Sequence, residues 1–237
     1  MAVPPPLSLY PASLDEAVII QNALRDKMRI ENDFDEIHTI AGIDASYDIQ
    51  NNITYAFIVV MDRATLKPIH AVRAAAPVSF PYIPGFLSFR EIPAILLAMD
   101  QLDQKPDLLM VDGQGIAHPR RMGIAAHLGV LMDLPAIGVA KSRLAGWNKD
   151  VGLQKGDQTP LIYKREQIGT VLRSKDNVKP LYISPGHRID QDTAVAITTE
   201  CLGRHRLPEP TRLADKISKT HKTSTMNFAQ PALFALS

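Results

Sequence analysis

The sequence predicts an α/β protein built on a mixed β-sheet. Three strand-like segments joined by short links, at 37–47, 54–61 and 68–75, predict an antiparallel meander. Two further short apolar runs, at 108–111 and 136–140, alternate with helical segments, which is typical of strand–helix units with parallel strands. We therefore expect three antiparallel strands followed by strand–helix units, in one mixed sheet flanked by helices.

The remaining elements follow from capping signals and hydrophobic spacing. Ser13 and Glu16 have the spacing of a capping box, which predicts a first helix that begins after Ser13. The other predicted elements are helices at about 88–102, 119–133, 190–202 and 211–219, a hairpin of 161–163 with 167–172, and a strand at 180–184.

Length and composition favour a single globular domain over the whole chain, 1–237. The 237 residues are 46% hydrophobic and 22% charged, and neither an internal repeat nor a domain boundary is evident. The proline-rich residues 1–12 and the segment from about 222 to 237 are expected to be flexible.

Several classes of protein are disfavoured by the sequence. No apolar run approaches the roughly 18–20 residues that span a membrane, and the first residues do not resemble a secretory signal. Cys201 is the only cysteine, so an internal disulfide and a cysteine-based zinc site are excluded. We expect a cytoplasmic protein with no membrane partner.

Charge is distributed unevenly along the chain. Residues 1–119 contain 8 Lys and Arg against 15 Asp and Glu, whereas residues 120–237 contain 18 against 10. This asymmetry could set phosphate-binding groups beside metal-binding acids, or the charges could simply mix on a solvated surface.

The segment 108–121 is the strongest candidate for a functional site. Its apolar run ends at Asp112, the place where ligands bind in open α/β sheets, and Gly113 and Gly115 would let a backbone or flat ring approach closely. His118 and the arginines around Pro119 would mark a helix start that favours anions. These features indicate a site that binds a metal, a phosphate and a planar group. The alternative is a tight turn between a strand and a helix, with a solvated aspartate.

The proline-stiffened loop at 77–91 carries several apolar and aromatic side chains, which either pack into the core or meet an apolar partner such as a nucleobase. Glu91 could form a capping box with Ser88. That capping would put Pro93 at the fifth helical position, where a backbone N–H is needed, so a site role for Glu91 gains weight.

Four acids recur at the ends of predicted elements: Asp44, Glu91, Asp112 and Asp215. Carboxylates suit Mg²⁺ and Mn²⁺, ions that support phosphoryl chemistry. If the first and fourth strands are neighbours, Asp44 and Asp112 meet, and Lys141 at the end of the next strand faces the same place. From the residues alone, we infer metal-dependent phosphodiester or phosphate chemistry.

Specific motifs extend this interpretation. The sequence resembles the endonuclease V family, the deoxyinosine 3′-endonucleases with a ribonuclease H-like fold. The resemblance covers about residues 13–220, and its matching segments are AGIDASYD at 41–48, PYIPGFLSFRE at 81–91, VDGQGIAHPRRMGIAAHLG at 111–129, IGVAK at 137–141, GHR at 186–188 and LPEPTRLAD at 207–215.

The resemblance implies a role for each matched residue. Asp44 and Asp112 match the aspartates that bind Mg²⁺, for which Mn²⁺ can substitute. Glu91 matches the catalytic glutamate near the metal, and Lys141 matches the catalytic lysine. Asp215 falls where family members have His or Asp near the metal. Tyr82 matches the residue that wedges into the duplex. The inosine pocket would consist of Gly85, Leu87, Gly113 and Ile124, and the substrate-binding positions would be His118, Ser184 and His187.

One position departs from the family. Gln114 stands where several bacterial members carry histidine, so this position cannot act as a general acid or base here. Its effect would be on pocket polarity or substrate preference.

The expected activity is repair of DNA that contains deoxyinosine. Cleavage would fall at the second phosphodiester bond 3′ to the lesion and leave 3′-hydroxyl and 5′-phosphate ends, with the protein acting as a monomer. Two alternatives stay open: an endoribonuclease for inosine-containing RNA, and a lesion-binding protein that has lost catalysis.

Overall fold

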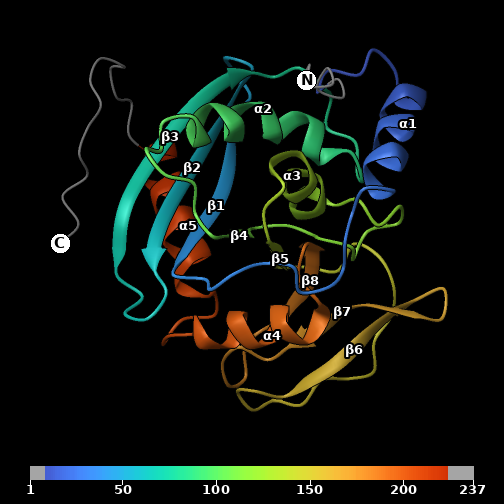
Figure 1. The fold of residues 1–237 in the computed structure, drawn as a ribbon, viewed down its shortest axis with the longest axis vertical. Helices are drawn as coiled ribbons and strands as arrows, with labels where there is room; N and C mark the ends of the chain where they lie inside the picture. Colours follow the sequence, from blue (N-terminus) through green and yellow to red (C-terminus); the bar gives the residue numbers. More distant parts are fainter. Residues whose placement is uncertain (1–8, 224–237) are drawn as a thin grey trace.

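The structure is a computed structural model that describes residues 9–223. In this part of the chain, one eight-stranded sheet has the order β3-β2-β1-β4-β5-β8-β7-β6 (Figure 1). The strands are β1 (Thr39–Asp48), β2 (Ile53–Asp62), β3 (Pro68–Pro77), β4 (Leu108–Val111), β5 (Ala136–Ala140), β6 (Gln158–Tyr163), β7 (Glu166–Leu172) and β8 (Leu181–His187).

Strand pairing confirms the predicted fold class. The first three strands form the antiparallel meander, and β4 and β5 add to β1 as parallel strands. β8, β7 and β6 then continue the sheet in antiparallel pairs. The result is the mixed sheet of a ribonuclease H-like fold.

Five helices cover the two faces of the sheet within the described residues: α1 (Leu14–Arg25), α2 (Leu87–Met99), α3 (Ile124–Met132), α4 (Gln191–Glu200) and α5 (Glu209–Thr223). The helices α2 and α3 pack on one face and α4 and α5 on the other, while α1 packs against α3 (Figure 1). No helix in this part of the chain is both long enough and apolar enough to cross a membrane.

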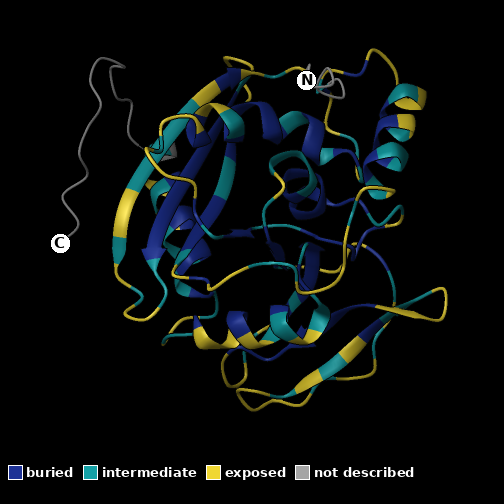
Figure 2. Ribbon diagram, in the orientation of Figure 1, coloured by how far each residue is buried: buried dark blue, intermediate teal, exposed yellow. Residues whose placement is uncertain are grey.

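Alternation along β1 shows how the sequence produces two cores. Ala41 and Ile43 face the cluster beneath α2 and α3, whereas Ile40 faces the cluster beneath α4. Successive side chains of a strand point to opposite faces, so a strand that is buried on both sides reads as a continuous apolar run. The central strands are accordingly buried, and exposed positions gather on the edge strands β3 and β6 (Figure 2).

The start of α2 differs from the capping-box alternative. Phe86 occupies the N-cap position without a side-chain hydrogen bond, and Ser88 lies inside the helix. Pro93 is in the helix interior, where it cannot donate to the carbonyl of Phe89 four residues earlier. The hydroxyl of Ser79 donates to that carbonyl instead, over 3.3 Å, so the helix tolerates its proline.

The helix predicted from residue 119 begins only at Ile124, so that prediction is wrong. Pro119, Arg120 and Arg121 lie in a turn, with Arg121 at a φ of 60°. Nδ1 of His118 accepts the backbone N–H groups of Arg120 and Met122, over 3.1 and 3.4 Å. This side chain stabilises the turn in place of a first helical turn.

The predictions for the two ends fall partly outside the described residues, which exclude 1–8 and 224–237. Near the first end, the capping box is seen in part, because Ser13 Oγ accepts the N–H of Glu16 over 3.1 Å. The Glu16 carboxylate accepts the N–H of Ala12 over 2.7 Å rather than that of Ser13. At the other end, α5 extends past the predicted stop at 219.

Candidate active site

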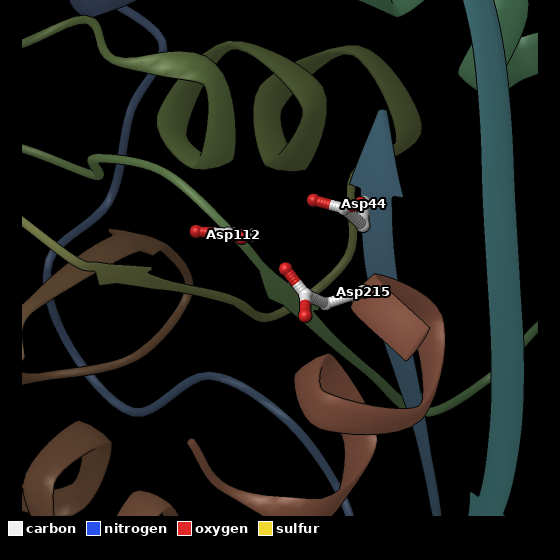
Figure 3. A group of neighbouring side chains, drawn as sticks. All are labelled: Asp44, Asp112 and Asp215. Carbon is white, nitrogen blue, oxygen red and sulfur yellow. The ribbon is translucent and has the colours of Figure 1, made fainter. Parts of the chain in front are cut away.

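Two aspartates meet at the carboxyl edge of the parallel strands. β1 and β4 are parallel neighbours with Ile43 opposite Val111, and the N–H of Asp112 donates to the carbonyl of Ile43 over 2.9 Å. Asp44 therefore lies beside Asp112, as expected from the sequence. Asp215 joins them from α5, and one carboxylate oxygen from each residue lies within 4.8 Å of the other two (Figure 3).

The third acid depends on a close approach between α5 and β1. A Cβ at Gly42 would lie 2.0 Å from the carbonyl oxygen of Pro210, so glycine alone lets the start of α5 rest on the strand. One turn beyond Asp215, the buried hydroxyl of Ser218 hydrogen-bonds to Asp44. Ser218 was missed by the sequence analysis, although its spacing of three from Asp215 places both on one helix face.

The acidic cluster is crowded, and its charge is only partly compensated. Burial, and then the neighbouring Asp112, raise the pKa of Asp44 to about 7. The ammonium of Lys141 contacts Asp112 and lies 2.7 Å from Asp215, which also receives Lys219 at 2.6 Å. Burial disfavours the charged form of Lys141, but Asp112 and Asp215 outweigh burial and raise its pKa.

This donor set fits a hard divalent cation. Three carboxylates offer oxygen ligands at one place, and Mg²⁺ and Mn²⁺ prefer such ligands. A cation there would relieve the mutual repulsion that raises the pKa of Asp44.

Glu91 lies next to this cluster but is not one of its three members. It is buried on α2, and the hydroxyl of Tyr47 donates to its carboxylate. Burial raises the pKa of Glu91 to about 8, against the hydrogen bond from Tyr47, while Asp44 and Asp112 add to the rise. Tyr47 was missed by the sequence analysis, because its partner comes from a separate helix.

A pocket of about 270 Å³ opens beside the acidic cluster and shares Asp112 and Lys141 with it. The four residues predicted for the base pocket all line it: Gly85, Leu87, Gly113 and Ile124. Tyr82 also lines the pocket and is 67% exposed. A Cβ at Gly113 would lie 2.5 Å from Cγ2 of Ile124, so the missing side chain keeps this wall open.

The pocket wall at Gly85 is held by three donors. This glycine has a φ of 84°, and its carbonyl accepts Nε2 of Gln21, Nε2 of His118 and Nη2 of Arg120 over 3.0, 3.0 and 2.7 Å. His118 is buried, and burial, followed by Arg120, lowers its pKa to about 4. His118 thus braces the pocket as a neutral ring and is not part of the acidic cluster. Gln21 and Arg120 were not predicted as site residues.

Gln114 connects the two loops that follow β4 and β5. Its Nε2 donates to the carbonyl of Ser142 over 2.8 Å, and both residues line the pocket. The residue that departs from the family pattern therefore lies in the pocket wall.

Ser184 and His187 lie on β8, two strands from β4 in the sheet. Ser184 is fully buried, and its Oγ accepts the N–H of Gly115 over 2.8 Å, which anchors the loop from behind. His187 pairs with Ala136 at the start of β5, at the opposite edge of the sheet, and its Nε2 lies 3.1 Å from Asp133. Both side chains are buried by packing within the fold, and their contact with substrate stays a prediction.

Comparisons with known proteins agree with the fold. The sequence profile described as Endonuclease V matches residues 22–216. Endonuclease V of Nostoc punctiforme is 49% identical over 210 residues, which are 88% of this chain and 95% of that protein. The crystal structure of Endonuclease V from Streptomyces avermitilis has a TM-score of 0.85 and 40% identity, and the match covers 90% of this chain and 95% of that one.

A third relative was crystallised with nucleic acid. Endonuclease V of Ciona intestinalis, in complex with a 24mer DNA containing an inosine followed by a ribo-adenosine, has a TM-score of 0.76 and 28% identity, and the match covers 89% of this chain and 98% of that one. From these matches, the chain belongs to the endonuclease V family of nucleases.

Proposed function

We propose that this protein is a metal-dependent DNA repair endonuclease that recognises deoxyinosine and hydrolyses the second phosphodiester bond 3′ to the lesion. The observation that carries the proposal is the continuity of Asp112 and Gly113, because one residue belongs to the acidic cluster and the next lines the pocket. A base held in the pocket thus lies beside the groups that suit phosphodiester chemistry. The inosine-containing DNA bound by the Ciona relative supports this assignment.

Recognition requires that the base leave the stack. The pocket wall carries no side chain at Gly113 and Gly85, so it suits a flat ring read by backbone groups. Hypoxanthine lacks the exocyclic amine of adenine and guanine. Tyr82 projects as an exposed ring from the same lining and would fill the gap in the duplex. That insertion would offset part of the unstacking cost, which is a few kcal/mol.

The carboxylates of Asp44, Asp112 and Asp215 would hold Mg²⁺ or Mn²⁺, with Glu91 close by. When bound, such an ion polarises the phosphate and makes water a better nucleophile at neutral pH. Lys141 carries a firmly held positive charge and would neutralise the charge that develops on the scissile phosphate. Water adds to phosphorus and the 3′ oxygen leaves, which gives 3′-hydroxyl and 5′-phosphate ends.

The direct test is cleavage of a DNA oligonucleotide with one deoxyinosine, with product ends mapped on a sequencing gel. We expect a single nick that requires inosine and Mg²⁺ and disappears in Asp112→Asn. Equal cleavage of the matched strand with adenine, or full activity in EDTA, would refute the proposal.

A second candidate substrate is inosine-containing RNA, and the ribo-adenosine after the inosine in the Ciona complex favours testing it. Matched DNA and RNA strands with one inosine separate the two. If cleavage needs a 2′-hydroxyl next to the scissile bond, the assignment to DNA fails.

A lesion-binding protein without catalysis is disfavoured, because Asp44, Asp112 and Lys141 lie together as catalysis requires. Stable binding of the inosine strand without any Mg²⁺-dependent product would support that alternative. A cytoplasmic location and a monomeric state stay predictions.

For the wedge, Tyr82→Ala should weaken binding of inosine duplex, and Tyr82→Phe should retain most of it, because the ring rather than the hydroxyl fills the gap. Binding is compared on a duplex and on a single strand. An equal affinity of Tyr82→Ala and wild type for the duplex would contradict the wedge.

A further inference from the structure

An exposed tryptophan stands near the pocket and has no role in the scheme above. Trp147 is the only tryptophan of the chain and is 56% exposed. It lies on the loop that leaves β5 at Lys141, and two earlier residues of that loop, Ser142 and Leu144, line the pocket. An exposed aromatic ring beside a nucleic-acid site has a face on which a base can stack.

The loop presents this ring in a fixed position. The backbone N–H and carbonyl of Trp147 pair with those of Ile162 in β6, each over 2.8 Å. Gly146 has a φ of 81°, and a Cβ there would lie 2.6 Å from the carbonyl oxygen of Ile162. Ala145 is buried in the core beneath β6 and β7. The backbone at residues 145–147 is therefore held against β6, and this contact presents the indole at the surface.

Charges around the ring favour a polyanion. Arg143 and Lys149 are exposed on the same loop, with Asp150 as the one acid among residues 142–150. Nη1 of Arg143 lies 3.4 Å from Oδ1 of Asn148, so this cation stays close to the residue that follows the tryptophan. Basic side chains interleaved with an aromatic ring are typical of surfaces that bind single-stranded nucleic acid.

We propose that Trp147 is a stacking platform for a nucleobase of the substrate strand, outside the pocket and adjacent to the lesion, with Arg143 and Lys149 contacting its phosphates. This inference rests on the proposed function, because it extends the same strand beyond the flipped base. It is favoured over a contact with a second copy of the chain by the continuity of the loop with the pocket and by its positive charge.

The single tryptophan makes the test direct, because all indole fluorescence comes from Trp147. The full-length protein in EDTA is titrated with a single strand that contains one deoxyinosine, and indole emission is recorded beside the anisotropy of a labelled strand. In a matched series, an abasic spacer replaces one neighbouring base at a time. We expect the strand to quench the emission, and one spacer position to abolish the quenching.

Substitutions at Trp147 measure how much the ring contributes to strand binding. Stacking on one aromatic ring predicts that Trp147→Ala weakens strand binding about 5- to 100-fold, while Trp147→Phe retains most of the affinity. Leu153→Ala is the matched control, since Leu153 is 62% exposed and does not line the pocket. Circular dichroism confirms that each variant folds, and Trp147→Phe keeps the test valid if the alanine variant does not.

Each other outcome is decisive. If anisotropy shows binding while the emission does not change with any strand, the platform is refuted and the proposed function stands. If the strand is not bound in EDTA and is not nicked when Mg²⁺ is supplied, the proposed function itself fails. If the emission changes with protein concentration alone and the chain self-associates through Trp147, a second copy covers the ring and the platform is refuted.

Discussion

The two edges of the parallel strands hold the same types of side chain in opposite electrostatic situations. At the carboxyl edge, Asp44 and Asp112 crowd together, and the pKa of Asp44 is raised. At the opposite edge, Asp133 receives Arg29 at 2.8 Å and His187 at 3.1 Å, and the hydrogen bond from His187, aided by the arginine charges, lowers its pKa. An acid whose charge the chain compensates stabilises the fold, whereas a cluster in which burial and a neighbouring carboxylate raise the pKa of Asp44 is poised to bind an external cation.

The largest effect should come from the carboxyl edge. Asp44→Asn is expected to reduce nicking to background, because it removes a carboxylate ligand, while the free energy of unfolding in EDTA stays equal or rises because a buried charge is removed. Nicking assays and urea titrations measure the two quantities. Asp103→Asn, at an exposed acid, is the control and should change neither. Wild-type nicking in Asp44→Asn would refute the metal assignment.

A second prediction compares the glycines beside the two edges. A Cβ at Gly186 would lie 2.8 Å from backbone atoms of Ala125, which cannot move easily, whereas a Cβ at Gly113 would meet a side-chain methyl of Ile124. Gly186→Ala should therefore cost about 1–3 kcal/mol of unfolding free energy, as overpacking typically does.

Gly113→Ala should instead reduce cleavage of inosine DNA with little loss of stability, and the effect should shrink in an Ile124→Ala background. A double-mutant cycle on the cleavage rate checks this. If the losses of cleavage rate in Gly113→Ala and Ile124→Ala were simply additive, Gly113 would not act through its contact with Ile124 in the pocket wall.

The third prediction concerns the compensated edge itself. His187→Ala leaves the backbone N–H of Arg29 without its acceptor and removes one of the partners of Asp133, which keeps Arg29 and Arg188, so we expect a loss of about 1–3 kcal/mol in unfolding free energy. The nicking rate of the folded variant should equal that of wild type. A loss of nicking without a loss of stability would return His187 to the substrate site.

The smallest effect is a pH dependence that arises from burial rather than from charge pairing. Burial lowers the pKa of His127 to about 3, while an unfolded chain titrates this ring near pH 6.5. The unfolded state therefore binds more protons below about pH 6.5, and stability must fall as pH falls through that range. Urea titrations at pH 7 and pH 5 should show a smaller drop in unfolding free energy for His127→Gln than for wild type. An identical drop would contradict the assignment of this pH dependence to His127.

The sequence was most informative where a residue's position in the fold follows from the strand that carries it. Asp44 and Asp112 could be brought together on paper because parallel neighbouring strands end at one edge. Asp215 was one of the four acids at the ends of predicted elements, and the family resemblance added its place near the metal and the base-pocket role of Gly85 and Gly113; the structure places Asp215 in the acidic cluster and both glycines in the pocket lining.

The sequence was least informative where a partner comes from a distant segment. The acceptor role of His118 Nδ1, which displaces the start of α3 to Ile124, needs a turn that no local pattern signals. Gln21 reaches Gly85 from α1, and Tyr47 reaches Glu91 from β1. Motif matching also could not tell which edge of the sheet the GHR motif at 186–188 occupies, and the structure pairs His187 with Ala136 at the start of β5.

The contact between Gly42 and Pro210 means that Asp215 can join the acidic cluster only after α5 has been synthesised. The strands that carry Asp44 and Asp112 leave the ribosome long before α5, and the helix can dock only on the exposed backbone at Gly42. A nascent or truncated chain that stops before Glu209 therefore lacks the third carboxylate, however well its sheet has formed. The order of translation alone delays a complete acidic cluster until α5 has been made.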